Sequence, residues 1–235
     1  MTEEMKRKRR RRKKINPIIP CITGLLFVIL MILVMKVDVG TVEATGTTIG
    51  LYHLNTGFAA LTGINVIWYK ITTVLGIFLV LFAAGFALIG LLQLIQRKNL
   101  WKVDYEILSL GGLYAVVIAF YVLFDKVVIN YRPIIMEGEK APEASFPSSH
   151  TMLVCVVMGS AMMLLDRYIR DEKLVKILKV LCAVVIAITV IGRLICGVHW
   201  LTDIMGGVLL SVTLLMIFNN VLAMKKRRKK KREDK

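Results

Sequence analysis

The sequence has few cysteines, and their positions argue against two common kinds of stabilised small domain. Cys21, Cys155, Cys182 and Cys196 lie in or beside apolar stretches. They lack the paired spacing of a zinc site, and we expect no disulfide framework from them. The chain also shows no visible internal repeat, which gives little support to a transporter.

Acidic residues are scarce as well. The chain has 16 Asp and Glu against 32 Lys and Arg, a formal net charge of +16, although 57% of its residues are hydrophobic. This combination is not typical of a soluble domain. Basic residues gather at the ends, nine in a row at 6–14 and eight at 225–232. Such runs bind either nucleic acid or anionic lipid headgroups. Beside apolar segments they favour the lipid, so we expect no nucleic-acid partner.

Six apolar segments are close to the roughly 20 residues that cross a bilayer core. The first follows a basic leader, but it is too long for a typical signal peptide and has no small-residue cleavage site, so we expect a retained anchor. The sequence therefore predicts an all-α polytopic membrane protein with six transmembrane helices in 15–224, between basic tails at 1–14 and 225–235. The segments cover residues 15–37, 71–95, 107–124, 151–165, 174–195 and 200–224.

The charges of the connections predict the orientation. Connections 96–102 and 166–173 contain Lys and Arg, as the two tails do. In 38–70, by contrast, Lys70 is the only Lys or Arg. Because basic connections stay on the cytoplasmic side, we expect both termini to be cytoplasmic in a multi-pass protein of the cell membrane. The chain has no Asn-x-Ser/Thr acceptor for glycosylation, which is compatible with a bacterial plasma membrane.

This orientation brings scattered polar residues to one membrane face. The first, third and fifth segments then end on the outer side, where an unpaired charge beside hydrocarbon is costly unless it has a partner or a ligand. Residues 51–70, on the same side, form either an interfacial helix or lid, or an ordinary loop. The residues that we expect to converge there are Arg132, His150, Arg193 and His199.

His199 and Asp203 are four residues apart at the start of the sixth segment. On a helix they share one face, so the carboxylate can accept a hydrogen bond from one ring nitrogen and leave the other free and more basic. A nucleophilic or general-base histidine is prepared in this way. The alternative is structural, with Asp203 accepting from backbone amides at the helix start.

A second polar cluster, Pro147-Ser148-Ser149-His150, directly precedes the fourth segment. Its serines can cap that helix, and free amides at a helix N-terminus bind anions. Arg132 and Arg193 can add forked donors to the same oxygens, a geometry that suits phosphate. Simple capping explains the serines alone, whereas two arginines and two histidines on the same face favour a phosphate site.

Together these motifs resemble those of the type 2 phosphatidic acid phosphatase superfamily, six-helix membrane phosphatases related to vanadium haloperoxidases. The third motif of that family, Ser-Arg, five residues, His, three residues, Asp, corresponds to Gly192-Arg193, His199 and Asp203. The second, Pro-Ser-Gly-His, corresponds to residues 147–150. The first, Lys, six residues, Arg-Pro, is approximate, because five residues separate Lys126 from Arg132.

The resemblance implies a metal-independent lipid phosphatase without a cofactor, in which arginines take the role that magnesium has elsewhere. His199 would be the nucleophile that becomes a phosphohistidine, Asp203 would orient it, and His150 would protonate the leaving oxygen. The phosphoryl oxygens would be held by Arg132, Arg193, Ser148 and Ser149, with Lys126 as a further ligand. We expect a membrane lipid substrate with a mono- or diphosphate, undecaprenyl diphosphate being favoured.

Three positions depart from the family pattern. Gly192 replaces the serine, Ser149 replaces the glycine, and Lys126 is one residue out of register, which rotates a helical side chain by roughly 100°. These departures leave two alternatives, a lipid phosphotransferase of the same fold and a non-catalytic lipid-binding or transport membrane protein. The sequence does not indicate an oligomeric state.

Overall fold

Six long helices make up most of the molecule. The computed structural model describes residues 15–136 and 138–233, with the backbone alone for 226–233. The long helices are α2 (Ile18–Lys36), α4 (Val66–Arg97), α5 (Tyr105–Lys126), α6 (Ser149–Tyr168), α7 (Glu172–Ile195) and α8 (Leu201–Glu233). All six are long and apolar enough to cross a membrane, α8 as far as Lys225. The predicted all-α architecture with six spans is confirmed.

The helix ends differ from the predicted segments where polar residues continue a helix. The second begins five residues earlier than expected, because the side chain of Asn65 accepts hydrogen bonds from the amides of Ile67 and Trp68. The fourth has 20 residues instead of the short predicted stretch, because the helix includes His150 at its start and Arg167 near its end. Hydropathy alone places such residues outside a span.

The region between the first two spans contains a hairpin, for which no expectation was stated, and a helix within residues 51–70, where a helix was one of the two alternatives. Strands β1 (Gly40–Val42) and β2 (Thr47–Ile49) form an antiparallel hairpin, and helix α3 (Tyr52–Thr62) follows. Asp38 anchors this region, since its carboxylate accepts from the backbone N–H of His53 at 2.9 Å and lies 2.7 Å from Nδ1 of that ring. These hydrogen bonds hold the pKa of Asp38 below its usual range.

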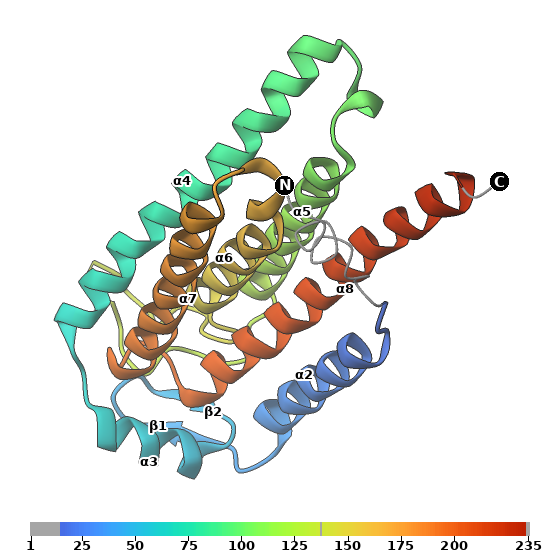
Figure 1. Cartoon of the computed structure of the whole chain (residues 1–235). Coiled ribbons are helices and arrows are strands. Elements are labelled where there is room, and N and C mark those ends of the chain that lie inside the picture. Colours follow the sequence, from blue (N-terminus) through green and yellow to red (C-terminus); the bar gives the residue numbers. More distant parts are fainter. Residues whose placement is uncertain (1–14, 137, 234–235) are drawn as a thin grey trace.

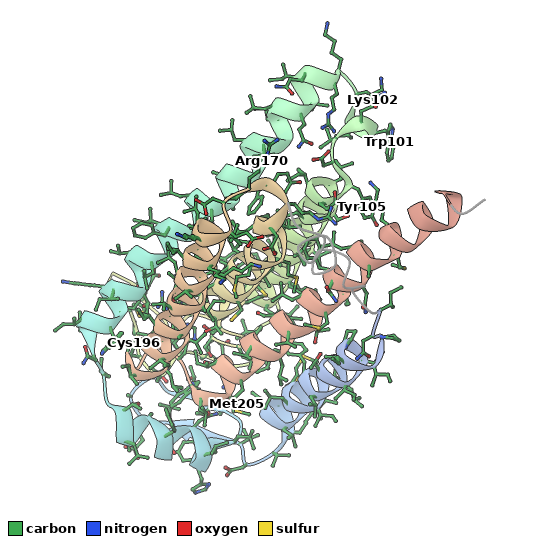
Figure 2. The ribbon with its side chains drawn as sticks, viewed as in Figure 1. Trp101, Lys102, Tyr105, Arg170, Cys196 and Met205 are labelled. Carbon is green, nitrogen blue, oxygen red and sulfur yellow. The ribbon has the colours of Figure 1, made fainter. Side chains whose placement is uncertain are left out.

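The elements divide the bundle into two ends (Figure 1). The hairpin and α3 lie at one end, which we call the hairpin end, and the C-terminal ends of α4 and α8 lie at the other. Cys196 and Met205 lie toward the hairpin end, whereas Trp101, Lys102, Tyr105 and Arg170 lie at the opposite end (Figure 2). The turn η1 (Leu100–Lys102) and the basic connection 166–173 therefore share the end away from the hairpin.

Helix α6 is the centre of the bundle. Val154, Val156, Ala161 and Leu164 on this helix are fully buried, whereas α2, α4 and α7 expose large apolar side chains such as Ile18, Val80 and Ile177. Helix α2 packs along α8, and α4 packs along α7. In a bilayer, lipid solvates the apolar side chains that the outer helices expose. The tightly buried core is therefore confined to the middle of the bundle, around α6.

The described residues include most of the second predicted basic tail and none of the first. Residues 1–14 lie outside the described residues. At the other end the backbone of α8 continues without a break from the apolar span to Glu233, so the predicted boundary at 225 is not an interruption of the helix. All four cysteines are free.

Candidate active site

A cavity of about 250 Å³ lies between α5, the connection from α5 to α6, and the start of α6. One part of its wall is aromatic and belongs to α5, and another is polar and carries three of the residues predicted from the motifs, Arg132, Ser149 and His199. The wall thus joins an apolar surface to a group of anion-binding side chains. The lining residues are Phe120, Tyr121, Phe124, Asp125, Arg132, Glu143, Ala144, Ser145, Phe146, Pro147, Ser149, Met152 and His199.

His199 lies just before α8 and not on it. Its Nδ1 is 3.5 Å from Oδ2 of Asp203, so the two side chains are neighbours as expected, although only Asp203 belongs to the helix. The same Oδ2 accepts from the backbone N–H of Trp200 at 2.9 Å. Asp203 therefore closes the first turn of α8, as the structural alternative supposed, while standing next to the histidine ring. Catalytic hydrogen bonds often shorten only in the substrate complex.

Burial and charge determine the protonation state of His199. Its side chain is 2% exposed, and neither ring nitrogen has a hydrogen-bond partner among the described residues. Burial lowers the pKa of His199 well below its usual value, and the nearby guanidinium groups of Arg132 and Arg193 lower it further. The imidazole is therefore neutral at neutral pH, the form in which a ring nitrogen has a free lone pair.

The connection between α5 and α6 brings Arg132 to the cavity. Tyr131 forms an antiparallel bridge with Ala144, and the Arg132 amide donates to the Glu143 carbonyl at 3.0 Å. Trp200 fixes this bridge to the third motif, because its indole N–H donates to the Tyr131 carbonyl at 2.7 Å. The Arg132 side chain is 13% exposed and is paired through Nη2 with the Glu143 carboxylate at 3.0 Å.

The second and third motifs touch through their backbones. Ser148 caps α6, with its hydroxyl accepting from the Thr151 amide at 3.5 Å, and its own N–H donates to the Asp203 carbonyl at 2.9 Å. A Cβ added at Gly207 would lie 2.9 Å from the Ser148 carbonyl oxygen, and one at Gly206 would lie 2.7 Å from the Phe146 ring. Glycine at these two positions therefore permits the close approach of α8 to the start of α6 and to the residues just before it.

The remaining predicted residues lie behind the cavity wall or away from it. Arg193 is 1% exposed, and its three guanidinium nitrogens have no hydrogen-bond acceptor among the residues that the structure describes. His150, in the first turn of α6, is close enough to Arg132 and Arg193 to interact with their charges, and its Nδ1 is buried without a partner in the described chain. Lys126 is separate, with a side chain 78% exposed and paired with Asp125 at 3.0 Å.

Two further groups support the site and were not predicted from the sequence. Asn130 and Ser145 are buried, and their polar side chains lie close to the Asp203 carboxylate. Asn55, fully buried on α3, donates to the Thr202 hydroxyl at 3.0 Å and accepts from the Thr202 amide at 3.3 Å. Thr202 lies between His199 and Asp203, so α3 holds the third motif in place.

The described residues contain no group of three or more His, Cys, Asp or Glu arranged to hold a metal ion. The cavity is lined by Arg132 and His199 together with the carboxyls of Asp125 and Glu143. The guanidinium group of Arg132 suits an anion.

Comparison with known proteins agrees with the motifs. The PAP2 superfamily model matches residues 107–227, just over half of the chain. No curated protein sequence matches. A solved structure from Bacillus subtilis, described as the first transmembrane PAP2-type phosphatidylglycerolphosphate phosphatase, matches with a TM-score of 0.62 and 18% sequence identity, over 88% of this chain and 96% of that one. The chain therefore belongs to the PAP2 superfamily, as a multi-pass membrane protein with a fold similar to that of a transmembrane PAP2-type phosphatase.

Proposed function

We propose that this protein is a membrane lipid phosphatase that hydrolyses a phosphate or diphosphate lipid at the hairpin end through a phosphohistidine. The observation that carries this proposal is the cavity that Arg132, Ser149 and His199 line together, with an aromatic wall from α5. The polar part fits a phosphoryl group, and the aromatic part fits the first carbons of a lipid tail. A neutral His199 is in the form that a nucleophile requires.

In the proposed reaction, Nε2 of His199, the ring nitrogen away from Asp203, attacks phosphorus while the bond from phosphorus to the leaving oxygen breaks. His150 gives that oxygen its proton. Water then attacks the phosphohistidine and gives a proton to His150, the bond from phosphorus to His199 breaks, and inorganic phosphate leaves with both imidazoles restored. Asp203 stabilises the positive charge that His199 acquires when it bonds to phosphorus.

The phosphoryl oxygens are the proposed ligands of Arg132, Arg193, Ser148 and Ser149. Arg132 has to exchange Glu143 for the phosphate, whereas Arg193 already lacks an acceptor among the described residues. The hydroxyl of Ser148 caps α6, which leaves the amides at the helix start as donors. Lys126 joins this set by resemblance, and it reaches the phosphate only if its pair with Asp125 opens. The reaction needs no metal or cofactor in this scheme, because the arginines stabilise the charge.

The favoured substrate is undecaprenyl diphosphate, and phosphatidylglycerol phosphate and phosphatidic acid are the comparison substrates. The solved relative is described as a phosphatidylglycerolphosphate phosphatase, which supports including that lipid. In the proposed orientation the hairpin end faces outward from a bacterial plasma membrane and both termini are cytoplasmic. The connection 166–173 and η1, at the opposite end, contain Lys and Arg, which the positive-inside rule assigns to the cytoplasm. The basic tails then contact anionic headgroups there.

Phosphate release by the detergent-purified full chain, with EDTA present, tests the proposal across the three lipids. We expect release from at least one lipid and a fall of at least about 10³-fold in His199→Ala, as for loss of other nucleophiles. His53→Ala is the matched control, because His53 lies at the same end with an exposed side chain and pairs with Asp38. Release from His199→Ala at the wild-type rate refutes the mechanism. Transfer of phosphate to an added lipid or sugar acceptor in preference to water supports the phosphotransferase instead.

A further inference from the structure

The surroundings of Arg193 raise the question of what holds its charge in place. The residue is 1% exposed, and its Nε, Nη1 and Nη2 find no acceptor in the described part of the chain. A buried cation without a compensating group is costly. An arginine that must meet a phosphoryl group in one orientation therefore needs a contact that fixes it without using its donors.

Tyr69 supplies such a contact. The guanidinium carbon of Arg193 lies over the Tyr69 ring, 5.1 Å from the ring centroid, within the range of a cation–π interaction. The ring attracts the positive charge through its face, so the interaction does not require the N–H groups that point at an anion. Arg193 can be held by Tyr69 and still offer its N–H donors to a ligand.

The start of α4 is fixed against the end of α7, which places Tyr69 beside Arg193. Asn65, the cap of α4, donates its N–H to the carbonyl of Cys196 at 3.2 Å, just beyond the end of α7. Figure 2 labels Cys196 at this end of the bundle. This backbone hydrogen bond fixes the first turn of α4, which contains Tyr69, relative to the end of α7, which contains Arg193.

Gly192 allows the two helices to approach at this level. A Cβ at this position would lie 2.6 Å from Cγ2 of Thr72 and 3.0 Å from Cε3 of Trp68, both on α4. The family pattern has serine here, and its side chain would push α4 away from α7. The departure at 192 and the position of Tyr69 thus have one physical cause, the close packing of α4 on α7.

We propose that Tyr69 is a positioning residue that holds the Arg193 guanidinium ready for the substrate's phosphoryl group. The inference rests on the proposed function for the identity of that anion. Tyr69 lies outside the residues 107–227 that match the family model, so this contact comes from the N-terminal part of the chain. The role requires the aromatic face and not the hydroxyl, which gives the experiment its design.

The test compares Tyr69→Phe with Tyr69→Leu in the detergent-purified full chain. Binding of inorganic phosphate and of orthovanadate is measured by calorimetry, together with KM and kcat for phosphate release. We expect Tyr69→Phe to bind both anions within about 2-fold of the wild type, and Tyr69→Leu to bind them about 2- to 30-fold more weakly, with KM raised more than kcat is lowered. In an Arg193→Gln background, Tyr69→Leu should cause no further loss.

Tyr105→Leu is the matched control. Lys225 Nζ lies 4.4 Å from the Tyr105 ring centroid, a contact of the same kind at the opposite end of the bundle. This variant should leave anion binding unchanged while losing a comparable contact.

Three results would overturn the role of Tyr69: equal anion affinities for Tyr69→Leu and the wild type with phosphate release intact, equal losses for Phe and Leu at position 69, or an undiminished effect without Arg193. A wild type that neither binds these anions nor releases phosphate would overturn the proposed function as well.

Discussion

Asn55 provides the sharpest test of how the third motif is held in place. Its side-chain amide donates to the Gly50 carbonyl at 2.9 Å and to the Thr202 hydroxyl at 3.0 Å, and its oxygen accepts from the Thr202 amide. That amide lies in the first turn of α8, where a backbone N–H has no partner within the helix. Asn55→Ala therefore leaves two polar groups of Thr202 unpaired where the residue is fully buried.

The expected loss follows from these contacts. Each buried polar group left without a partner costs about 1–3 kcal/mol, so two such groups on Thr202 give a loss of about 2–4 kcal/mol in the free energy of unfolding after partial relaxation. Thr202→Val removes only the hydroxyl, and we expect about 1 kcal/mol from it. Because the residues share a hydrogen bond, the double variant should be less destabilised than the sum by about 0.5–1.5 kcal/mol.

Equilibrium unfolding in mixed micelles measures all four proteins of this double-mutant cycle, and phosphate release is measured on each. Asn99→Ala is the control, since the exposed Asn99 caps η1 at the opposite end through a single bond to the Trp101 amide. It should cost no more than about 1 kcal/mol and leave activity unchanged. Additive losses for Asn55→Ala and Thr202→Val would refute the idea that α3 holds the third motif through this pair.

Three further predictions concern the site directly. Gly207→Val should abolish phosphate release and cost several kcal/mol in stability, because its Cβ would lie 2.9 Å from the Ser148 carbonyl; thermal unfolding and activity check this, and a wild-type rate would contradict it. Because the pKa of His199 lies below 6.5, the rate of phosphate release should persist as pH falls through 6.5. The free energy of unfolding should decline over the same pH range, because the unfolded chain binds a proton at this histidine and the folded chain does not. A fall of kcat/KM toward acid pH with a midpoint at 6.5 or above would contradict this. Glu143→Gln should lower KM a few-fold, since Arg132 no longer has to leave a charged partner, and a raised KM would show that Glu143 supports the site instead.

Much of this structure was predictable because hydropathy and the motifs depend on local sequence. Each membrane span has to satisfy its own backbone hydrogen bonds and be apolar over about 20 residues, so the six helices are visible as apolar runs. The predicted ends of the fourth span were wrong for the same reason. A hydropathy average excludes polar residues such as His150 and Arg167, although both belong to α6. The hairpin, with three residues in each strand, is too short to give a periodic signal.

The contacts that shape the site were harder to predict because they join distant parts of the chain. Asn55 and Tyr69 reach the third motif across more than a hundred residues, so their contacts depend on the tertiary fold. The pair of His199 and Asp203 was read as helical from its spacing, but α8 begins two residues after the histidine. Spacing alone did not show that the Trp200 amide would occupy the carboxylate.

The covalent intermediate is the most direct test of the central claim. The full chain is mixed with a lipid that it hydrolyses, labelled in the phosphate, and quenched with alkali within one turnover; the protein is then assayed for label that survives alkali and is lost in acid, as a phosphohistidine is. We expect such label on the wild type and on His53→Ala, and none on His199→Ala. Equal labelling of His199→Ala, or release of phosphate by a wild type that is never labelled, would contradict the account.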